Sequence, residues 1–487
     1  MNPEPNDPQG TGSREDAPHP EQDRRQRPDH RLTRRYRWLL FAITLPLFLV
    51  VLTLATTQYR DQRTQLLDEL ARSLDNHAIS LDSLAQQAGD HVQRMKSWYE
   101  SVPHAPSDEV RALRQYLRPR LSSSGAPDGW SLDALPASLR KRNGQVLMPS
   151  THPRMPLDQA DQALAFFSLL SLSHEIAPHF EWSYTIRADN AYHAIYPWID
   201  SRHFIEGQGL PNLVQGAHSF FTYEVYTAGL PSKNPEGRAY WTRPYNDASG
   251  MGAMVSHGAP VYRSGRFTGI VGTDLRLAVL EDQLRSLPRT AGDFWILGKD
   301  GEILGTTWGP ANPILRNLDD IPAGQLTRSE YAAATASPTR ILETDQHILI
   351  EHTLNHAPWT LLHVVDQKEI AALLLPRFVP YGVILAVLAG TFLLALFLLR
   401  REFINPAFEL VHYIQRVSRD PAAAEPSVPR LWQTWVTVVS RTFAANREAS
   451  RKLKENEAFK TAIVDNALLA VITMDAEGRV VEFNPAA

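Results

Sequence analysis

The sequence predicts an α+β protein in which a large folded region lies between two membrane-spanning helices. Two uncharged, mostly apolar segments, residues 38–57 and 378–399, enclose residues 58–377. The enclosed region opens with a long amphipathic pattern and continues with short β-rich stretches bounded by turn residues. With 487 residues the chain is also too long for a single hydrophobic core.

The two apolar segments predict the membrane topology. About 20 helical residues cross the hydrocarbon core of a bilayer, so each segment is long enough. The first is longer than a typical signal-peptide core and LATTQ is a poor cleavage site, so we interpret it as an uncleaved anchor. Arginines precede it, and Arg400 and Arg401 follow the second segment. Since basic flanks stay cytoplasmic, we expect both termini inside and residues 58–377 outside.

Residues 1–37 are rich in Pro, Arg and acidic residues, which predicts a disordered cytoplasmic tail before the first span.

A long amphipathic helix is predicted over residues 58–100. Ten residues recur there at alternating spacings of three and four, and eight of them are apolar: Leu67, Leu70, Leu74, His77, Leu81, Leu84, Ala88, His91, Met95 and Trp98. The stripe fits a dimer stalk that carries a signal. It fits equally a helix packed along its own ectodomain.

Two successive α+β modules are predicted, a membrane-distal one over residues 101–288 and a membrane-proximal one over 289–377. The β-rich stretches are 182–188, 191–199, 252–262, 267–277 and two around 347–366, with a helical pattern at 277–287. Hairpin turns are expected at Arg263-Ser264-Gly265 and at Lys299-Asp300-Gly301.

The composition excludes several kinds of chemistry. Basic and acidic residues nearly balance, 49 against 53, which gives no reason to expect a nucleic-acid partner. The chain has no cysteine, so disulfides, thiolate nucleophiles and thiolate metal sites are excluded. His174 and His179 are five apart with Pro178 between them, which does not fit the zinc-protease spacing. We expect no catalytic residue, metal or cofactor within these residues.

One stretch, residues 238–252, has the composition of a binding-pocket wall. Arg238 or Arg243 could hold an anion, Asp247 an amine, and Trp241 and Tyr245 could exclude water. In a continuous strand alternate residues share a face, so Trp241, Arg243 and Tyr245 are expected to point together. The alternative is that the aromatic residues are only core and that Arg238 and Asp247 form a surface ion pair.

A family resemblance supports the pocket. GAMVSHGAPVYRSGRFTGIVGTDLRLAVLEDQL, followed by FWILGKDGEIL, resembles the double-Cache class of bacterial extracytoplasmic sensors. The resemblance implies two stacked PAS-like modules on a long helix, with a ligand in the distal one. It also implies that WTRPYND and Asp274 in VGTDL line the pocket.

The C-terminal part predicts a cytoplasmic relay. Residues 400–455 form two helical patterns joined by PAAAEPSVP, which resembles a HAMP relay, with a plain coiled-coil linker as the alternative. Residues 456–487, ending in FNPAA, resemble the start of a PAS domain, which we expect to be truncated here.

These resemblances imply a receptor in a bacterial inner membrane, expected to be a homodimer. Its ligand is expected to be a small molecule, with an amino acid or a carboxylate as the first guess. For the output, the resemblance first implies cyclic-di-GMP turnover by GGDEF or EAL domains. A sensor histidine kinase is the alternative, and a chemoreceptor is a third possibility.

Overall fold

The computed structural model describes residues 30–101, 108, 110–113, 115, 129–149, 157–311, 314–322, 324–420 and 422–487. The chain divides into two compact units, Gln58–Arg377 on one side and Met1–Thr57 with Phe378–Ala487 on the other. The expected tail lies mostly outside the described residues, but helix α1 (His30–Glu100) already begins within it.

The distal module of the Gln58–Arg377 unit is built on an antiparallel sheet. Its strand order is β1-β3-β2-β7-β6-β4, and β5 also pairs with β6. The strands are β1 (Gln145–Leu147), β2 (Phe180–Arg187), β3 (His193–Tyr196), β4 (Tyr240–Trp241), β5 (Tyr245–Asn246), β6 (Ala253–Arg263) and β7 (Arg266–Arg276). The predicted β6–β7 hairpin is confirmed, and both residues of its turn, Ser264 and Gly265, have positive φ.

Helices cover both faces of this sheet. On one face α1 and α4 (Leu157–Ile176) form a core with β6 and β7, in which Met95, Phe166 and Val271 are fully buried. On the other face lie four short helical segments, α5 (Ser201–Gly207), α6 (Leu213–Ser219), η1 (Phe220–Thr222) and α7 (Glu224–Thr227). They pack against Tyr184 and Ile186 of β2 in a second core. A further short helix, α3 (Ala137–Arg140), precedes β1.

The proximal module is a five-stranded antiparallel sheet of order β10-β11-β12-β8-β9. The predicted helix α8 (Leu277–Ser286) leads into it from β7. Its strands are β8 (Asp293–Leu297), β9 (Ile303–Thr306), β10 (Ile341–Glu343), β11 (His347–Thr353) and β12 (Thr360–Asp366), joined by η2 (Leu318–Asp320) and α9 (Arg328–Ala336).

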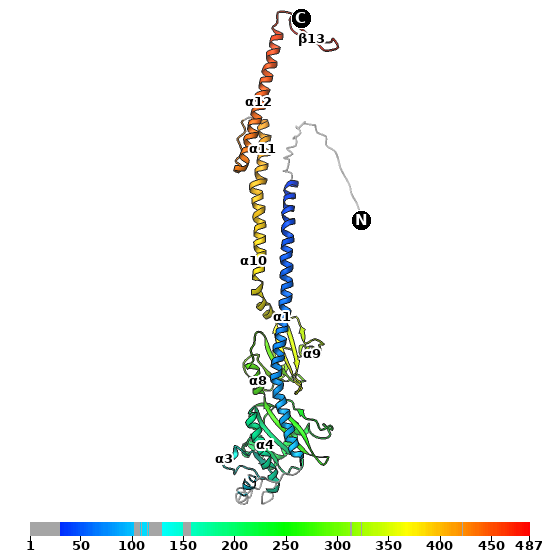
Figure 1. Cartoon of the computed structure of the whole chain (residues 1–487), viewed down its shortest axis with the longest axis vertical. Coiled ribbons are helices and arrows are strands. Elements are labelled where there is room, and N and C mark those ends of the chain that lie inside the picture. The colour runs from blue at the N-terminus through cyan, green and yellow to red at the C-terminus, as the bar shows by residue number, and fades with distance from the viewer. Residues whose placement is uncertain are drawn as a thin grey trace, which may run out of the picture. The chain divides into compact units, whose positions relative to one another are not determined.

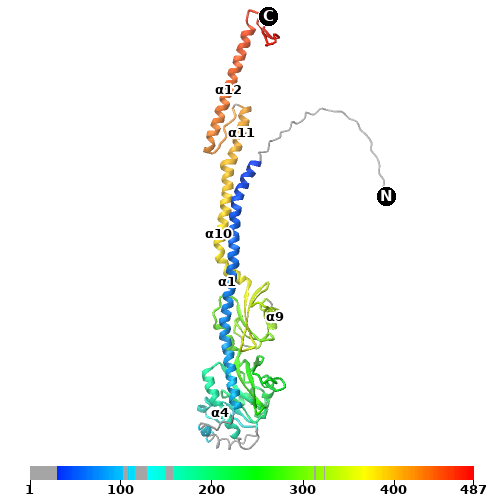
Figure 2. The same cartoon turned by 45° about the vertical axis from the view of Figure 1, so that its right-hand side comes forward.

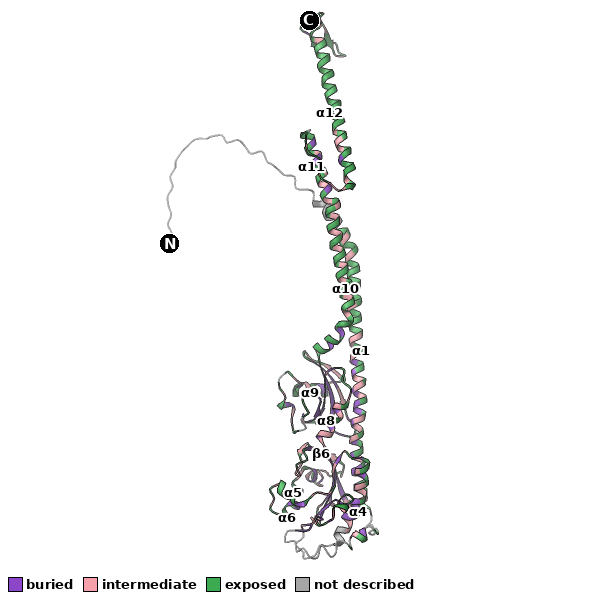
Figure 3. Cartoon of the chain, turned by 90° about the vertical axis from the view of Figure 1, so that its left-hand side faces the viewer, coloured by how far each residue is buried: buried purple, intermediate pink, exposed green. Residues whose placement is uncertain are grey.

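Helix α1 lies along both modules of this unit, as both views show (Figures 1 and 2). Eight of the ten residues of the predicted stripe are buried, and Leu84 and Trp98 are half-buried. Figure 3 shows buried positions recurring along the part of α1 that lies beside the two modules. The two modules of this unit therefore cover the stripe, which favours the second interpretation of this helix, that it packs along its own folded region.

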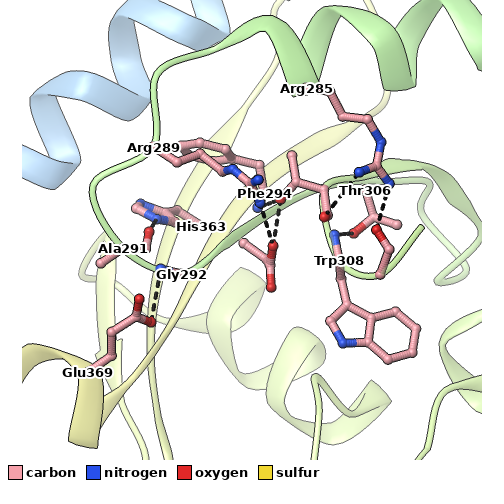
Figure 4. A network of polar contacts seen from close by, with 12 residues as sticks. Arg285, Arg289, Ala291, Gly292, Phe294, Thr306, Trp308, His363 and Glu369 are labelled. Carbon is pink, nitrogen blue, oxygen red and sulfur yellow. Dashed lines mark hydrogen bonds and ion pairs between the residues drawn. The ribbon is translucent and has the colours of Figure 1, made fainter. Parts of the chain in front are cut away.

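Polar contacts fasten the proximal module to the first turn of α10 (Gln367–Leu399). Figure 4 shows Glu369 of α10 accepting a hydrogen bond from the backbone N–H of Gly292, at 3.0 Å. Beside it, His363 Nε2 of β12 lies 2.7 Å from the carbonyl oxygen of Ala291. The segment that enters β8 is thus held by both the sheet and α10.

The second unit contains the apolar helical segments. α1 and α10 are each long and apolar enough to cross a membrane, and their apolar segments are exposed. After η3 (Arg400–Ile404) come α11 (Asn405–Arg419) and α12 (Arg430–Asp465), which pack through Tyr413, Val417 and Val436. The chain then forms a two-stranded ribbon, β13 (Ile472–Met474) with β14 (Val480–Phe483).

Candidate functional site

A cavity lies in the distal module, on the sheet face that the short helical segments cover. Its volume is about 70 Å³. Its wall is mainly apolar and aromatic, with Trp182, Ile186 and Ile195 from the sheet and Phe204, Phe220 and Val225 from the helical segments. Ligand pockets commonly enclose ~300–1,000 Å³. The cavity therefore admits a compact group, and a larger ligand must displace part of the wall.

A buried carboxyl group, that of Asp274, lines this cavity. Its side chain is 3 % exposed, and its Oδ1 accepts hydrogen bonds from the Tyr184 hydroxyl at 2.8 Å and from Ser256 Oγ at 2.7 Å. Tyr245 extends the network, since its hydroxyl lies 2.8 Å from Ser256 Oγ. Tyr184 can reach Asp274 because Gly272, opposite it on β7, has no side chain.

The surroundings of Asp274 change its acidity. Burial raises the pKa of Asp274 to about 7, although hydrogen bonds from Ser256 and Tyr184 favour the carboxylate, and the negative charge of Asp247 raises the pKa further. Burial also raises the pKa of Tyr184 and of Tyr245 well above the usual range, so both remain protonated donors at neutral pH.

A second carboxyl group, that of Asp247, lines the same cavity and is held by its own loop. Its Oδ2 accepts hydrogen bonds from the backbone N–H of Ser249 at 3.0 Å and of Met251 at 3.1 Å, and from the Ser249 hydroxyl. The backbone N–H of Asp247 donates to the carbonyl of Gly252 at 2.8 Å, which closes the loop. The loop thus fixes the direction of the Asp247 carboxylate.

The structure brings Tyr245, Asp247 and Asp274 together, but it places Trp241, Arg243 and Arg238 elsewhere. The expectation that Trp241, Arg243 and Tyr245 share one face was wrong. Trp241 pairs with His257 and Tyr245 pairs with Met254. The segment from β4 to β5 therefore contains one residue more between these two pairs than β6 does. This is a β-bulge, and one extra residue reverses which face the following side chains occupy.

Trp241 and Arg243 contact the proximal module instead. Trp241 Nε1 donates to the carbonyl of His356 at 3.0 Å, and its ring centroid lies 4.5 Å from those of Trp359 and His257. Arg243 pairs with Asp300 in the β8–β9 turn at 2.9 Å.

Arg238 lies at the surface, where it pairs with Glu236. It does not line the cavity.

A histidine network occupies the opposite face of the distal sheet. His91 Nε2 and His174 Nε2 each lie 2.8 Å from Ser183 Oγ. Among the described residues no group of three or more His, Cys, Asp or Glu side chains could hold a metal ion. His179 packs its ring on Phe180, with centroids 4.5 Å apart. His91, which is buried, and His174, which is half-buried, are thus joined through Ser183 in one hydrogen-bonded group.

Sequence reasoning missed the pocket residues Tyr184 and Ser256. Tyr184 was assigned to a strand without a role, and Ser256 lies in a strand whose pattern is almost wholly buried. The position of the hairpin turn did not indicate Ser256, because the register counted from the turn pairs Ser256 with Thr273, and only a shift between Val261 and Tyr262 places it opposite Asp274.

The comparisons with known proteins identify the class of the distal module. Residues 180–282 match the family described as methyl-accepting chemotaxis protein-like, first PDC sensor domain. They contain the strands that carry Tyr184, Tyr245 and Asp274. This region is therefore a PDC-type, Cache-like ligand-binding sensor domain of a signal-transduction protein. No curated protein sequence matches the chain significantly.

Several solved sensor domains are similar at low identity. The ligand-binding domain of the Pseudomonas fluorescens chemoreceptor CtaA, in complex with L-leucine, is 18% identical, with 40% of this chain and 75% of that chain covered and a TM-score of 0.28. The ligand-binding domain of the Pseudomonas aeruginosa PAO1 amino acid chemoreceptor PctC, in complex with GABA, is 16% identical, with 58% of this chain and 98% of that chain covered and a TM-score of 0.29. The extracellular domain of mmHK1S-Z2, described as a histidine kinase, is 17% identical, with 41% of this chain and 79% of that chain covered and a TM-score of 0.30. All three TM-scores are below 0.5, so the assignment rests on the family match.

Proposed function

We propose that this chain is a transmembrane receptor that binds a small extracytoplasmic molecule in the cavity of its distal module. The observation that carries the proposal is the buried Asp274 carboxyl group, which lines an apolar cavity inside a region that matches a sensor-domain family. Burying a titratable carboxyl costs free energy, and such groups are concentrated at functional sites. Tyr245, Asp247 and Asp274 are the proposed ligand contacts.

The proposed topology has both termini in the cytoplasm and residues 58–377 in the periplasm. Two helices long and apolar enough to cross a membrane flank the sensor region, and basic residues border both apolar segments on the same proposed side. The hydrogen bond between Gly292 and Glu369 joins the proximal module to α10, so a movement of this module could be transmitted along α10, which continues through the second apolar segment. A homodimer is part of the proposal, since receptors of this kind relay motion between paired helices.

The proposed output is cytoplasmic. The α11–α12 pair is a candidate HAMP-like relay or coiled-coil linker, and β13–β14 a candidate start of a PAS domain. Cyclic-di-GMP turnover by a GGDEF or EAL module is the first proposal for the output, and a histidine kinase is the alternative. A chemoreceptor gains support from the description of the matching family, which is that of chemotaxis proteins.

The ligand is proposed to be small, with amino acids and carboxylates as the classes expected from the sequence. The cavity supplies two carboxyl groups that suit the ammonium group of an amino acid.

A ligand screen on the whole chain in detergent tests the proposal. Thermal unfolding, followed by the fluorescence of the 11 tryptophans, is measured against amino acids, amines and carboxylates. We expect at least one compound to raise the unfolding temperature of the wild type and of Arg238→Ala, which changes a residue outside the cavity. The same compound should not stabilise Tyr245→Ala/Asp247→Ala. An equal shift in that double variant would show that the ligand binds elsewhere.

A further inference from the structure

The charges around the cavity are of one sign. Asp247 and Asp274 are the two ionisable acids that line it, and none of the described lining residues is Lys, Arg or His. The tyrosines that line it, Tyr184, Tyr223 and Tyr245, are neutral at physiological pH. A ligand carboxylate placed here would meet like charges without a cationic partner, whereas a cation would be attracted by both acids.

The hydrogen bonds leave acceptor positions for such a cation. Tyr184 and Ser256 both donate to Oδ1 of Asp274, and the three donors to Asp247 all contact its Oδ2. The remaining oxygen of each carboxyl group can therefore accept from an ammonium group, which carries three donors. The faces of Trp182 and Phe220 in the wall are further favourable surfaces for a cation.

His193 of β3 lies on the same side of the sheet, where it packs against Phe220 and Phe221, and burial lowers its pKa to about 3, so it is neutral. A charged basic side chain on this side is that of Arg276. It follows Asp274 by two residues on β7, so the two side chains share a face. Its guanidinium is 2.8 Å from Glu181, and it does not line the cavity. Arg276 is thus neutralised by Glu181, and its side chain would have to move toward the cavity to provide a carboxylate site.

We propose that the cavity selects small organic amines through the ammonium group alone and requires no carboxylate on the ligand. This inference rests on the proposed function, because it assigns a ligand class to the same cavity. It differs from the sequence expectation of an amino acid or a carboxylate. The small volume adds a preference for a compact apolar group on the amine.

A dependence on pH follows from the proposal. Amine binding requires the Asp274 carboxylate, and the pKa of Asp274 is about 7. An alkylammonium ion titrates near ~10.4, as lysine does, so it stays charged between pH 6 and pH 8. The groups that face Asp274 are Tyr184 of β2, Tyr245 of β5 and Asp247, and Arg276 of its own strand is paired. The affinity for an amine should therefore rise about tenfold from pH 6 to pH 8 as Asp274 loses its proton.

The experiment is calorimetric titration of the whole chain in lipid nanodiscs with two matched sets of probes. One set is L-valine, its decarboxylated analogue isobutylamine and its deaminated analogue 3-methylbutanoate. The other set is L-alanine, ethylamine and propionate. We expect an amine to bind at least about tenfold more tightly than its parent amino acid, because the carboxylate is repelled, and we expect neither carboxylic acid to bind.

Two variants and the pH series locate the effect. Asp274→Asn should weaken amine binding by about 10- to 100-fold, the range for a hydrogen bond to a charged group, and should abolish the dependence on pH. Arg276→Gln is the matched control and should leave amine binding unchanged. If Asp274→Asn does not fold, the pH series on the wild type decides, and an affinity that is flat or falls from pH 6 to pH 8 overturns the proposal.

The outcomes separate this inference from the proposed function. Tighter binding of an amino acid than of its amine would show that a carboxylate is recognised, which overturns the amine selectivity and leaves the receptor function in place. If no member of either set binds, both the amine inference and the assignment of this cavity as the sensory site are refuted.

Discussion

The buried carboxyl group of Asp274 should lower the free energy of unfolding at neutral pH. Asp274→Asn should restore the stability that is lost in this way. The pKa is raised from 3.8 to about 7 on folding. Between these values the folded chain keeps a proton that the unfolded chain has lost, so raising the pH favours the unfolded chain. The free energy of unfolding therefore falls from about pH 4 and levels off above about pH 7.

The size of the effect follows from the shift. One pKa unit corresponds to ~1.36 kcal/mol, so the whole shift amounts to about 4 kcal/mol above pH 7 and about 2 kcal/mol at pH 5. Asparagine is neutral and keeps an amide oxygen for the hydroxyl groups of Tyr184 and Ser256. We expect Asp274→Asn to be more stable than the wild type by these amounts. For a unit the size of Gln58–Arg377, 4 kcal/mol corresponds to a rise of roughly 6 °C in the unfolding temperature.

Thermal unfolding of both proteins at pH 5 and pH 8, read by tryptophan fluorescence, measures the difference. Asp90→Asn on the exposed side of α1 is the matched control and should change the stability by less than about 0.5 kcal/mol. The reasoning is refuted if Asp274→Asn is less stable than the wild type at pH 8. It is refuted equally if the difference between them does not grow from pH 5 to pH 8.

Three further substitutions test the packing, each by equilibrium or thermal unfolding. Leu74→Ala, at a fully buried position of α1, should lower the free energy of unfolding by about 2–5 kcal/mol. Ile79→Ala, at a position of the same helix that is 67% exposed, should lower it by less than about 0.5 kcal/mol, and equal losses would contradict the observed buried face of α1. Trp241→Ala should lower the free energy of unfolding by about 2 kcal/mol and speed hydrogen exchange at residues 354–359, because it removes one of the contacts between the modules; unchanged exchange there would count against that contact. Thr327→Ala should lower the free energy of unfolding by about 1 kcal/mol, because it removes the capping box of α9. Thr335→Ala within the same helix should lower it clearly less, and a larger loss for Thr335→Ala would contradict the role of the cap.

The elements of the fold could be predicted because their signals are local. The turn at Ser264-Gly265 and the spacing of three and four along α1 depend on neighbouring residues only, and both agree with the structure. The first residues of the site, Tyr245 and Asp247, were found by composition.

The grouping of side chains in the site could not be predicted, because two bulges decide it. The bulge near Pro244 turns Tyr245 to the opposite face from Trp241. A second bulge, between Val261 and Tyr262, shifts the hairpin register by one residue, so that Ser256 pairs with Asp274 instead of with Thr273. A bulge inserts one residue without changing the hydrophobic pattern, so periodicity does not reveal it. Gly269 lies beside the second bulge, and its φ of 143° is a conformation that glycine adopts readily and other residues rarely adopt. This glycine is the residue in the sequence that could have indicated the bulge.

The shared helix α1 makes the two sensor modules one cooperative folding unit. Its buried face supplies Met95 to the distal core, while Asp75 and Asp82 bond to His352 and His356 of the proximal module at 2.7 Å each. Neither module can lose this helix without leaving apolar surface open to water, so neither can unfold while the other stays intact. Calorimetry of the sensor region should thus show one transition, and a ligand bound in the distal cavity should slow amide exchange in the proximal sheet as well.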